Sequence, residues 1–291
     1  MVIVIVGPTG VGKTKLSIEL AKKINGEVIN ADSTQVYRGM DIGTAKVTEE
    51  EKENIKHYLL DIKNIDEDYT VYDYQKDARS KIDEIINKGK TPILVGGTGL
   101  YIKAALYNYE FNLEDNSNYV DENLSNDELY NMLLKIDSNT SIHKNNRKRV
   151  IRALNSYYKN GKINNQKSDK LLYDAIFVGL TTDREILYNR INKRVDVMVQ
   201  NGLIDEAKKI YESGIRSKAV LTPICYKELF PYFEGIKTLD DCLDEIRLKS
   251  RHYAKRQYTW NKHQFNVKWF DVNFDDFNKT IDEVLDYIKT I

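Results

Sequence analysis

The chain has 291 residues, 41% of them hydrophobic and 30% charged, and its 44 basic residues balance 44 acidic ones. This length holds one large α/β domain plus a small insertion. The two cysteines, Cys225 and Cys242, are too few for a disulfide framework and wrongly spaced for zinc, which favours a reducing compartment. The N-terminal apolar run is too short for a signal peptide or a membrane span. We therefore expect a cytoplasmic protein, monomeric and not associated with membranes.

The first strand and the loop after it form the strongest motif. Val2–Val6 is a continuous β-branched run, as expected of a buried parallel strand. The next residues, GPTGVGKT, fit the phosphate-loop pattern and comprise Gly7, Pro8, Thr9, Gly10, Val11, Gly12, Lys13 and Thr14. Backbone N–H groups converge on a phosphate there, Lys13 adds a charge, and the Thr14 hydroxyl can bind Mg²⁺. We interpret the segment as a phosphate site rather than a plain glycine-rich turn.

The elements that follow alternate between helix and strand. In chain order we expect a helix over Lys15–Ile24, a strand over Glu27–Ala31, helices capped by Thr48 with Glu51 and by Thr70 with Asp73, and a strand over Pro92–Val95. This alternation builds a parallel sheet with helices on both faces. The fold class is therefore predicted as α/β, with a phosphate-loop NTPase-like parallel sheet flanked by helices.

The pattern changes over residues 110–142. An acidic, polar stretch precedes a helical one, Asp127–Ile136, and we expect a small, shortened helical insertion outside the sheet. The catalytic core then comprises residues 1–109 and 143–291. Its later elements are expected to be a strand over Ala175–Leu180, a long helix capped by Thr182 and Glu185, and a strand over Val267–Phe270.

Two polar segments are predicted at the carboxyl ends of strands, where open parallel sheets bind ligands. Asp32 follows the second strand, and a carboxylate beside Lys13 and a bound phosphate can accept a proton from a nucleophile. The alternative is a turn aspartate. Ser33, Thr34 and Gln35 extend this loop. Thr98, within Gly96–Gly99, lies where many phosphate-loop NTPases carry an acidic Mg²⁺ ligand.

Basic residues gather in the second half of the chain. Arg190 and Arg194 are one helical turn apart, which suits a diphosphate, although a solvated helix face is the simpler alternative. Residues 143–152 are basic without an acid. A second run interleaves Tyr253, Tyr258 and Trp260 with five cations, Arg247, Lys249, Arg251, Lys255 and Arg256. Such runs can track an RNA backbone and stack on its bases, or form a solvated amphipathic helix.

Six segments together resemble the bacterial tRNA dimethylallyltransferases (tRNA isopentenyltransferases): GPTGVGKT, INADSTQVYRGMDIGTAK, LVGGTGLYIK, NNRKRVIRAL, RINKRVDVMVQNGLIDEA and RHYAKRQYTW. The resemblance covers nearly the whole chain in the expected order. It implies transfer of a prenyl group from dimethylallyl diphosphate, with Mg²⁺, to N6 of the adenosine 3′ of the anticodon, in tRNAs that read codons beginning with U.

The resemblance also implies residue roles. Asp32 is the general base, Thr9 lies near the reacting centre, and Arg194, together with the phosphate loop, neutralises the departing diphosphate. The tRNA contacts are expected from Asp32, Ser33, Thr34, Gln35, Thr98, Lys148, Arg149, Val150, Ile151, Arg152, Thr222, Pro223, Ile224, Cys225, Tyr226 and Lys227. The target base must leave the stack to reach such a pocket.

Three departures from the family pattern concern RNA binding. Cys225 stands where the family carries a glycine before Tyr226, Asn261-Lys262 replaces Phe-Arg, and the segment from Glu110 to Ile142 is short. Rival functions are a prenyltransferase acting on free AMP, ADP or ATP, a small-molecule kinase in which Asp32 deprotonates a hydroxyl, and a non-catalytic RNA-binding relative.

Overall fold

The computed structural model describes residues 1–109, 119–121, 123–161, 163 and 170–291. The chain divides into two compact units, Met1–Tyr109 with Lys170–Ile291, and Glu110–Asp169. In the smaller unit, apolar residues of α6 (Arg147–Asn160) pack against Leu129 and Leu133 of α5 (Asn126–Ile136). This packing extends the unit past residue 142, the boundary drawn from the sequence, and includes the basic segment 143–152 in it.

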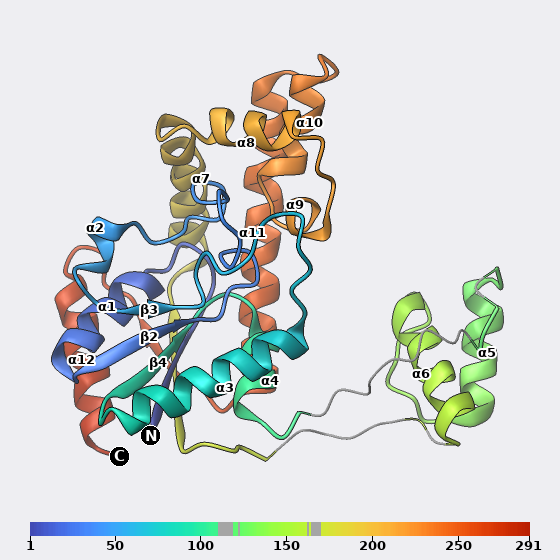
Figure 1. Cartoon of the computed structure of the whole chain (residues 1–291), viewed down its shortest axis with the longest axis horizontal. Coiled ribbons are helices and arrows are strands. Elements are labelled where there is room, and N and C mark those ends of the chain that lie inside the picture. Colours follow the sequence, from blue (N-terminus) through green and yellow to red (C-terminus); the bar gives the residue numbers. More distant parts are fainter. Residues whose placement is uncertain (110–118, 122, 162, 164–169) are drawn as a thin grey trace. The chain divides into compact units, whose positions relative to one another are not determined.

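The larger unit is built on a parallel sheet (Figure 1). The strands that the structure describes lie in the order β3-β2-β4-β1-β5-β6. They are β1 (Val2–Val6), β2 (Gly26–Asn30), β3 (His57–Tyr58), β4 (Thr91–Val95), β5 (Ala175–Thr181) and β6 (Lys268–Asp271). The predicted α/β class is confirmed. Because β1 lies at the centre, between β4 and β5, its carboxyl end opens at the middle of the sheet edge.

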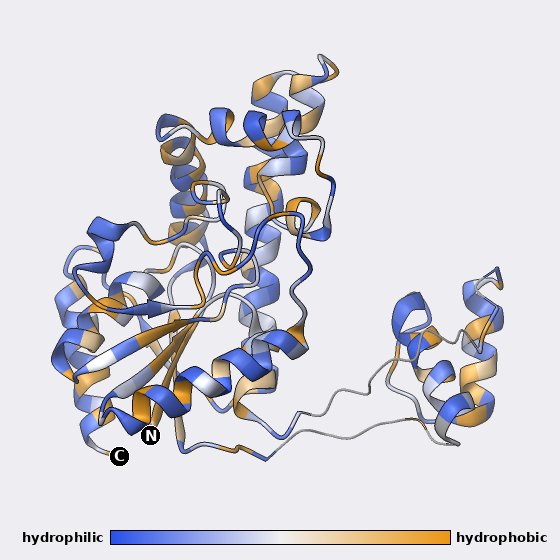
Figure 2. Ribbon diagram, in the orientation of Figure 1, coloured by the Kyte–Doolittle hydropathy of each residue, from blue (hydrophilic) through white to orange (hydrophobic). Residues whose placement is uncertain are grey.

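Alternate residues of β1 face two hydrophobic cores. Ile3 and Ile5 pack with α1 (Lys13–Lys23) and α12 (Phe277–Lys289), while Val2, Val4 and Val6 pack with α3 (Val71–Asn87) and α4 (Gly99–Leu106). All five side chains are 0% exposed, and each buried one stabilises the fold by roughly 1.5–3 kcal/mol. Figure 2 shows the apolar strands between helices with polar outer faces. The phosphate loop therefore starts from a rigid strand.

A third core joins helices from the second half of the chain to the loop that carries Val36 and Met40. The helices are α7 (Arg184–Gln200), α8 (Leu203–Glu212), α9 (Lys218–Leu221), α10 (Tyr226–Phe233) and α11 (Leu239–Gln264). In Figure 1 they stand above the carboxyl ends of the strands. Residues of α7 and α11 line the region beyond these strand ends.

Several local predictions can be compared with the observed caps. The capping boxes at Thr48 and Thr70 are confirmed, although α2 (Glu49–Lys52) is a single turn. The cap predicted for α7 is wrong: Asp183, not Thr182, accepts the backbone N–H groups at the start of that helix. A carboxylate one residue later reaches the same donors better than the threonine. Among the described helices, none is long and apolar enough to cross a membrane.

Candidate active site

The phosphate loop leaves β1 and enters α1 through glycines that other residues cannot replace easily. Gly7, Gly10 and Gly12 have φ values of 141°, 83° and 99°, a region that strains residues with a Cβ atom. A Cβ atom on Gly7 would lie 2.6 Å from the Leu180 carbonyl oxygen, and one on Gly12 would lie 2.8 Å from the Phe277 ring. Backbone conformation favours glycine at all three positions, and close packing adds to this at Gly7 and Gly12.

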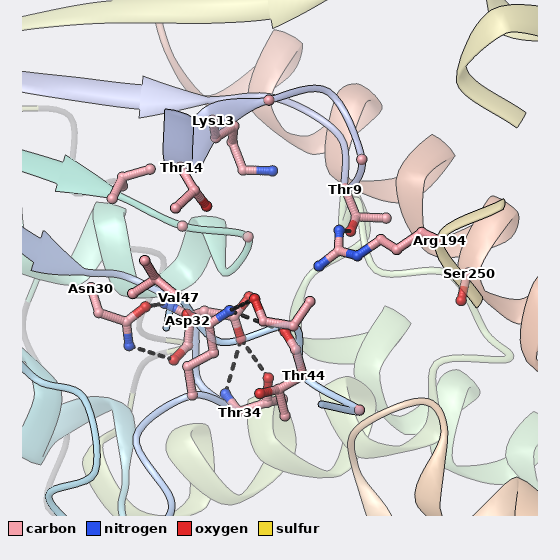
Figure 3. Close-up of a pocket in the computed structure, with 18 of the residues that line it drawn as sticks. Thr9, Lys13, Thr14, Asn30, Asp32, Thr34, Thr44, Val47, Arg194 and Ser250 are labelled. Atoms are coloured by element: carbon pink, nitrogen blue, oxygen red, sulfur yellow. Dashed lines mark hydrogen bonds between the residues drawn. The ribbon is translucent and has the colours of Figure 1, made fainter. Parts of the chain in front are cut away.

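Lys13 folds over the loop that precedes it. Its Nζ donates to the carbonyl oxygens of Gly7, at 3.0 Å, and Pro8, at 2.8 Å. Burial, with a further contribution from Arg194 and against the opposing effect of Asp32, lowers the pKa of Lys13 to about 7. A bound phosphate anion favours the charged ammonium. Thr14, at the start of α1, is exposed and lines the same cavity (Figure 3).

Two arginines of α7, Arg190 and Arg194, contact the phosphate loop. Arg194 Nη1 donates to the Thr9 hydroxyl at 2.8 Å. Arg190 Nε donates to the Gly10 carbonyl oxygen at 3.1 Å, and its guanidinium lies 3.8 Å from the centre of the Phe274 ring. Burial lowers the pKa of both arginines below the ordinary value. Both predicted arginines therefore contact the phosphate loop, Arg194 from a half-buried position and Arg190 from an exposed one.

Asp32 lies just past β2 and is held by its neighbours. Its backbone N–H donates to Asn30 Oδ1 at 3.0 Å, and Asn30 Nδ2 donates back to the Asp32 carbonyl oxygen at 3.0 Å. Thr34 donates to the carboxylate through both its N–H and its hydroxyl. The next residue, Ser33, donates its N–H to Thr98 Oγ1 at 3.0 Å. Thr98 thus links the Gly96–Gly99 loop to the Asp32 loop.

One cavity of about 1010 Å³ unites these groups. Figure 3 shows Lys13, Thr14 and Thr9 on one side and Asp32 and Thr34 on the other. Further predicted residues that line the cavity are Gly10, Gly12, Ser33, Gln35, Arg190, Arg194, Thr222, Pro223, Ile224 and Cys225. The cavity can therefore hold a phosphorylated molecule at one side and an acceptor with a removable proton at the other.

Two side chains of α11, Tyr253 and Gln257, line the cavity. The sequence analysis named Tyr253 only as part of the basic and aromatic run, and it did not single out Gln257. Gln257 accepts the Thr9 N–H and donates to the Gly97 carbonyl oxygen. Tyr253 Oη also donates to that oxygen, at 3.3 Å. Gln257 and Asn261 are both buried polar residues of this basic and aromatic helix. An uncharged polar side chain one helical turn from Ala254, on the buried face, is the signal that could have identified Gln257.

Glu206 of α8 organises the segment after Asp32. Its carboxylate accepts the backbone N–H groups of Asp41, Ile42 and Gly43 at 2.9–3.0 Å and the Tyr226 hydroxyl at 2.8 Å. Gln35 Nε2 in turn donates to the carbonyl oxygens of Thr44 and Ala45. The backbone of Asp41–Gly43 is thus folded around a carboxylate from a helix that is distant in the sequence.

Residues 222–227 approach the cavity with unequal exposure. Thr222 is exposed, while the side chains of Cys225 and Tyr226 are 3% and 0% exposed. Lys227 Nζ donates to the Leu221 carbonyl oxygen. Cys225 has φ of 107°, the left-handed region. Tyr226 therefore supports the segment from within, through Glu206.

The basic run of α11 is partly used inside the protein. Arg247 pairs with Asp196 and Asp244, Lys249 pairs with Glu228 and Glu245, and Arg251 donates to Asn192. Tyr258 packs on Trp269, and the Trp260 ring covers Gly99 and Phe265. Both rings are half-buried against protein, and their stacking on RNA bases stays a prediction.

In the smaller unit, α6 has two faces. Lys148, Arg149 and Arg152 are exposed, whereas Val150 is 1% exposed and packs in the core of that unit together with Ile151. The predicted tRNA-binding segment therefore presents its three charges to solvent and its apolar residues to α5.

Within the described residues, no three His, Cys, Asp or Glu side chains gather as a metal cluster. Mg²⁺ requires few protein ligands when phosphate oxygens and water supply the others. The exposed Thr14 hydroxyl beside the phosphate loop fits that arrangement.

The parallel sheet and its loop define a phosphate-loop protein of the α/β class. A sequence model of the family described as IPP transferase matches residues 35–264, and the chain belongs to this family. It is 48% identical to the tRNA dimethylallyltransferase of Anoxybacillus flavithermus, an alignment that covers 99% of this chain and 96% of that one. It is 46% identical to the tRNA dimethylallyltransferase of Bacillus subtilis, over 93% of this chain and 90% of that one.

Solved structures agree. A tRNA delta(2)-isopentenylpyrophosphate transferase from Staphylococcus epidermidis matches with a TM-score of 0.76 and 43% identity, covering 99% of this chain and 98% of that one. A eukaryotic dimethylallyltransferase acting on tRNA matches with a TM-score of 0.80 and 34% identity, covering 93% of this chain and 73% of that one.

Proposed function

We propose that this protein transfers a dimethylallyl group from dimethylallyl diphosphate to N6 of the adenosine 3′ of the anticodon, in tRNAs that read codons beginning with U. The observation that carries the proposal is the single cavity in which the phosphate loop faces Asp32, in a chain of the IPP transferase family. The new bond joins N6 to the allylic carbon, and the carbon–oxygen bond to diphosphate breaks.

The donor binds through its diphosphate. Backbone N–H groups of Gly10–Thr14 and the dipole of α1 attract the anion, and Lys13, Arg190 and Arg194 supply cations around it. Charge on the leaving diphosphate grows as the carbon–oxygen bond breaks, so these groups stabilise the transition state more than the ground state. Thr9, held by Arg194, lies at the end of the loop nearest this bond.

The acceptor amine gives up its proton to Asp32. The carboxylate is fixed by Thr34 and lies at the cavity wall. The loop Ser33–Gln35 supplies hydrogen-bonding groups for the flipped nucleotide, and residues 222–225 flank it. Thr98 acts beside the nucleotide by holding Ser33. A base in a single-stranded loop costs less to unstack than a paired one.

Thr14 would hold Mg²⁺ at the donor site, where the ion would supply positive charge to the leaving group. The exposed basic residues of α6, Lys148, Arg149 and Arg152, contact the tRNA backbone.

Both cysteines are free and buried, which supports a reducing compartment such as the cytoplasm. The enzyme is proposed to act as a monomer.

The test uses purified protein, Mg²⁺ and radiolabelled dimethylallyl diphosphate. An anticodon stem-loop with adenosines 3′ of the anticodon is expected to become labelled on one adenosine. Labelling of free AMP but not of the stem-loop would assign the protein to the nucleotide prenyltransferases. Phosphate transfer from ATP to a small alcohol without prenyl transfer would assign it to the kinases. Sedimentation at micromolar concentration tests the monomer.

A further inference from the structure

The side-chain amide of Gln257 connects two loops that are far apart in the sequence. Its Oε1 accepts the backbone N–H of Thr9 at 2.8 Å, and its Nε2 donates to the Gly97 carbonyl oxygen at 3.1 Å. The residue lies on α11 and is 6% exposed. Both polar ends of one buried side chain are thus used on two different loops.

One of these loops contacts the diphosphate side of the proposed site, and the other lies beside the proposed base. The Thr9 hydroxyl accepts from Arg194 on the diphosphate side. Gly97 lies against the proposed base: a Cβ atom on Gly97 would lie 2.9 Å from Asp32 Oδ2 and 2.4 Å from Gln257 Nε2. The amide therefore spans the distance between the donor site and the acceptor site.

We propose that Gln257 is a positioning residue that fixes the phosphate loop relative to Asp32. The role rests on the proposed function, because it matters only if diphosphate and the proton acceptor serve the same transfer. A reaction between two bound groups depends steeply on their separation. Without the amide, the Thr9 N–H loses its acceptor and the two loops move independently.

The chemistry of the contact restricts which residue can make it. One end must accept a hydrogen bond and the other must donate one, at the length of a glutamine side chain. Methionine has a similar size but offers neither group. A protonated glutamic acid offers both, since its carbonyl oxygen accepts and its hydroxyl donates. An ionised glutamate can only accept hydrogen bonds, so its negative charge repels the Gly97 carbonyl oxygen and the diphosphate.

This difference gives the role a signature in pH. Between pH 5 and 8.5 the Gln257→Glu enzyme is expected to gain kcat relative to wild type as the pH falls and the introduced carboxyl becomes protonated. The titratable groups that line the same cavity are Lys13, Asp32, Glu51, Arg190, Arg194, Tyr253 and Arg256, with His57, Lys15, Glu19, Glu53, Lys193 and Cys225 further along it. Dividing by the wild-type rate at each pH removes their common contribution.

The experiment compares wild type, Gln257→Met and Gln257→Glu in prenyl transfer to the stem-loop. Gln257→Met is expected to lower kcat and kcat/KM together, by about 10- to 100-fold. Gln257→Glu should be slower than Gln257→Met at pH 8.5 and faster at pH 5. Cys242→Ala is the matched control: Cys242 is buried in the same helix within the third core, so its loss lowers the unfolding midpoint while kcat stays at the wild-type value.

A Gln257→Met enzyme within twofold of the wild-type kcat, or a Glu-to-Met rate ratio that does not change with pH, would overturn the role. If wild type itself transfers no prenyl group, the proposed function fails separately. The contact is then judged by titration with inorganic pyrophosphate and Mg²⁺: Gln257→Met should weaken binding by about fivefold, and unchanged binding would reject the inference.

Discussion

The carboxylate of Asp32 accepts two hydrogen bonds from Thr34, one from the backbone N–H at 3.0 Å and one from the hydroxyl at 2.7 Å, and both reach Oδ1. This local turn fixes the carboxylate and leaves Oδ2 facing Gly97. A general base held in one orientation can take a proton without first rearranging. The pair therefore supports a catalytic role for Asp32 better than its position in the sequence alone.

Asp32→Asn keeps the shape of the side chain but removes the proton acceptor. We expect kcat for prenyl transfer to fall by about 10²- to 10⁴-fold, while the affinity for a stem-loop, measured by fluorescence anisotropy, changes little. Thr34→Val keeps the backbone hydrogen bond and loses the other, so its kcat should fall less, by about tenfold. Wild-type turnover in the asparagine variant would exclude Asp32 as the base.

Local features were predictable from the sequence because short-range chemistry determines them. The β-branched run of Val2–Val6 and the glycine spacing of the phosphate loop both depend on neighbours within a few residues, as do the caps at Thr48 and Thr70. Asp32 could be proposed as a site residue because the carboxyl ends of parallel strands meet at one sheet edge.

Long-range contacts were not predictable in the same way. Gln257 meets Thr9, and Glu206 meets the backbone of Ile42, across most of the chain, and no local pattern encodes either partner. The aromatic residues of α11 show a second limit. Helical periodicity indicates on which face of the helix Tyr258 and Trp260 lie, but not whether protein or RNA contacts that face. In the structure Tyr258 packs on Trp269, and Trp260 packs on Gly99.

Glu206→Gln tests the carboxylate that folds the segment after Asp32. Its oxygens accept four donors, and an amide would turn an NH₂ group toward some of them. We expect the free energy of unfolding, from urea titration, to fall by about 1–3 kcal/mol. Glu212→Gln is the control on the same helix, where an exposed carboxylate lies 3.9 Å from Lys208, and should change stability by at most about 0.5 kcal/mol. Equal effects of the two changes would contradict the assignment.

The exposed charges of α6 are predicted to bind the RNA backbone. Removing Lys148 and Arg149 together should weaken stem-loop binding for all sequences and reduce the slope of log K against log salt by about 1 for each lost phosphate contact. Lys159, exposed at the end of the same helix and outside the predicted segment, is the control. If Lys159→Ala lowers the slope as much as a single substitution of Lys148 or Arg149, the overall positive charge rather than this segment attracts RNA.

The thiol of Cys225 should be unreactive in the folded protein. Burial, with a further contribution from Glu228 and against the opposing effect of Arg194, raises its pKa to about 12. The thiolate is the reactive form, and because pH 8 lies far below this pKa, only about one molecule in ten thousand carries it there. In a Cys242→Ala background, iodoacetamide is expected to alkylate the urea-unfolded chain within minutes and the native chain far more slowly, with a rate that increases toward pH 11. Rapid alkylation of the native protein at pH 8 would show an accessible, more acidic thiol.

The backbone strain at Cys225 can be tested by measuring stability. Its φ of 107° suits glycine, the residue that the resemblance to tRNA dimethylallyltransferases places before Tyr226, and such conformations cost other residues about 1–3 kcal/mol. Cys225→Gly should therefore be more stable to urea than Cys225→Ala by about 1–2 kcal/mol, because alanine keeps the strain and loses the sulfur. Ala254→Gly in the interior of α11 gives the ordinary order, with glycine less stable by about 1 kcal/mol. An alanine variant that equals or exceeds the glycine variant at position 225 would mean that the surrounding packing, and not φ, decides which residue is tolerated there.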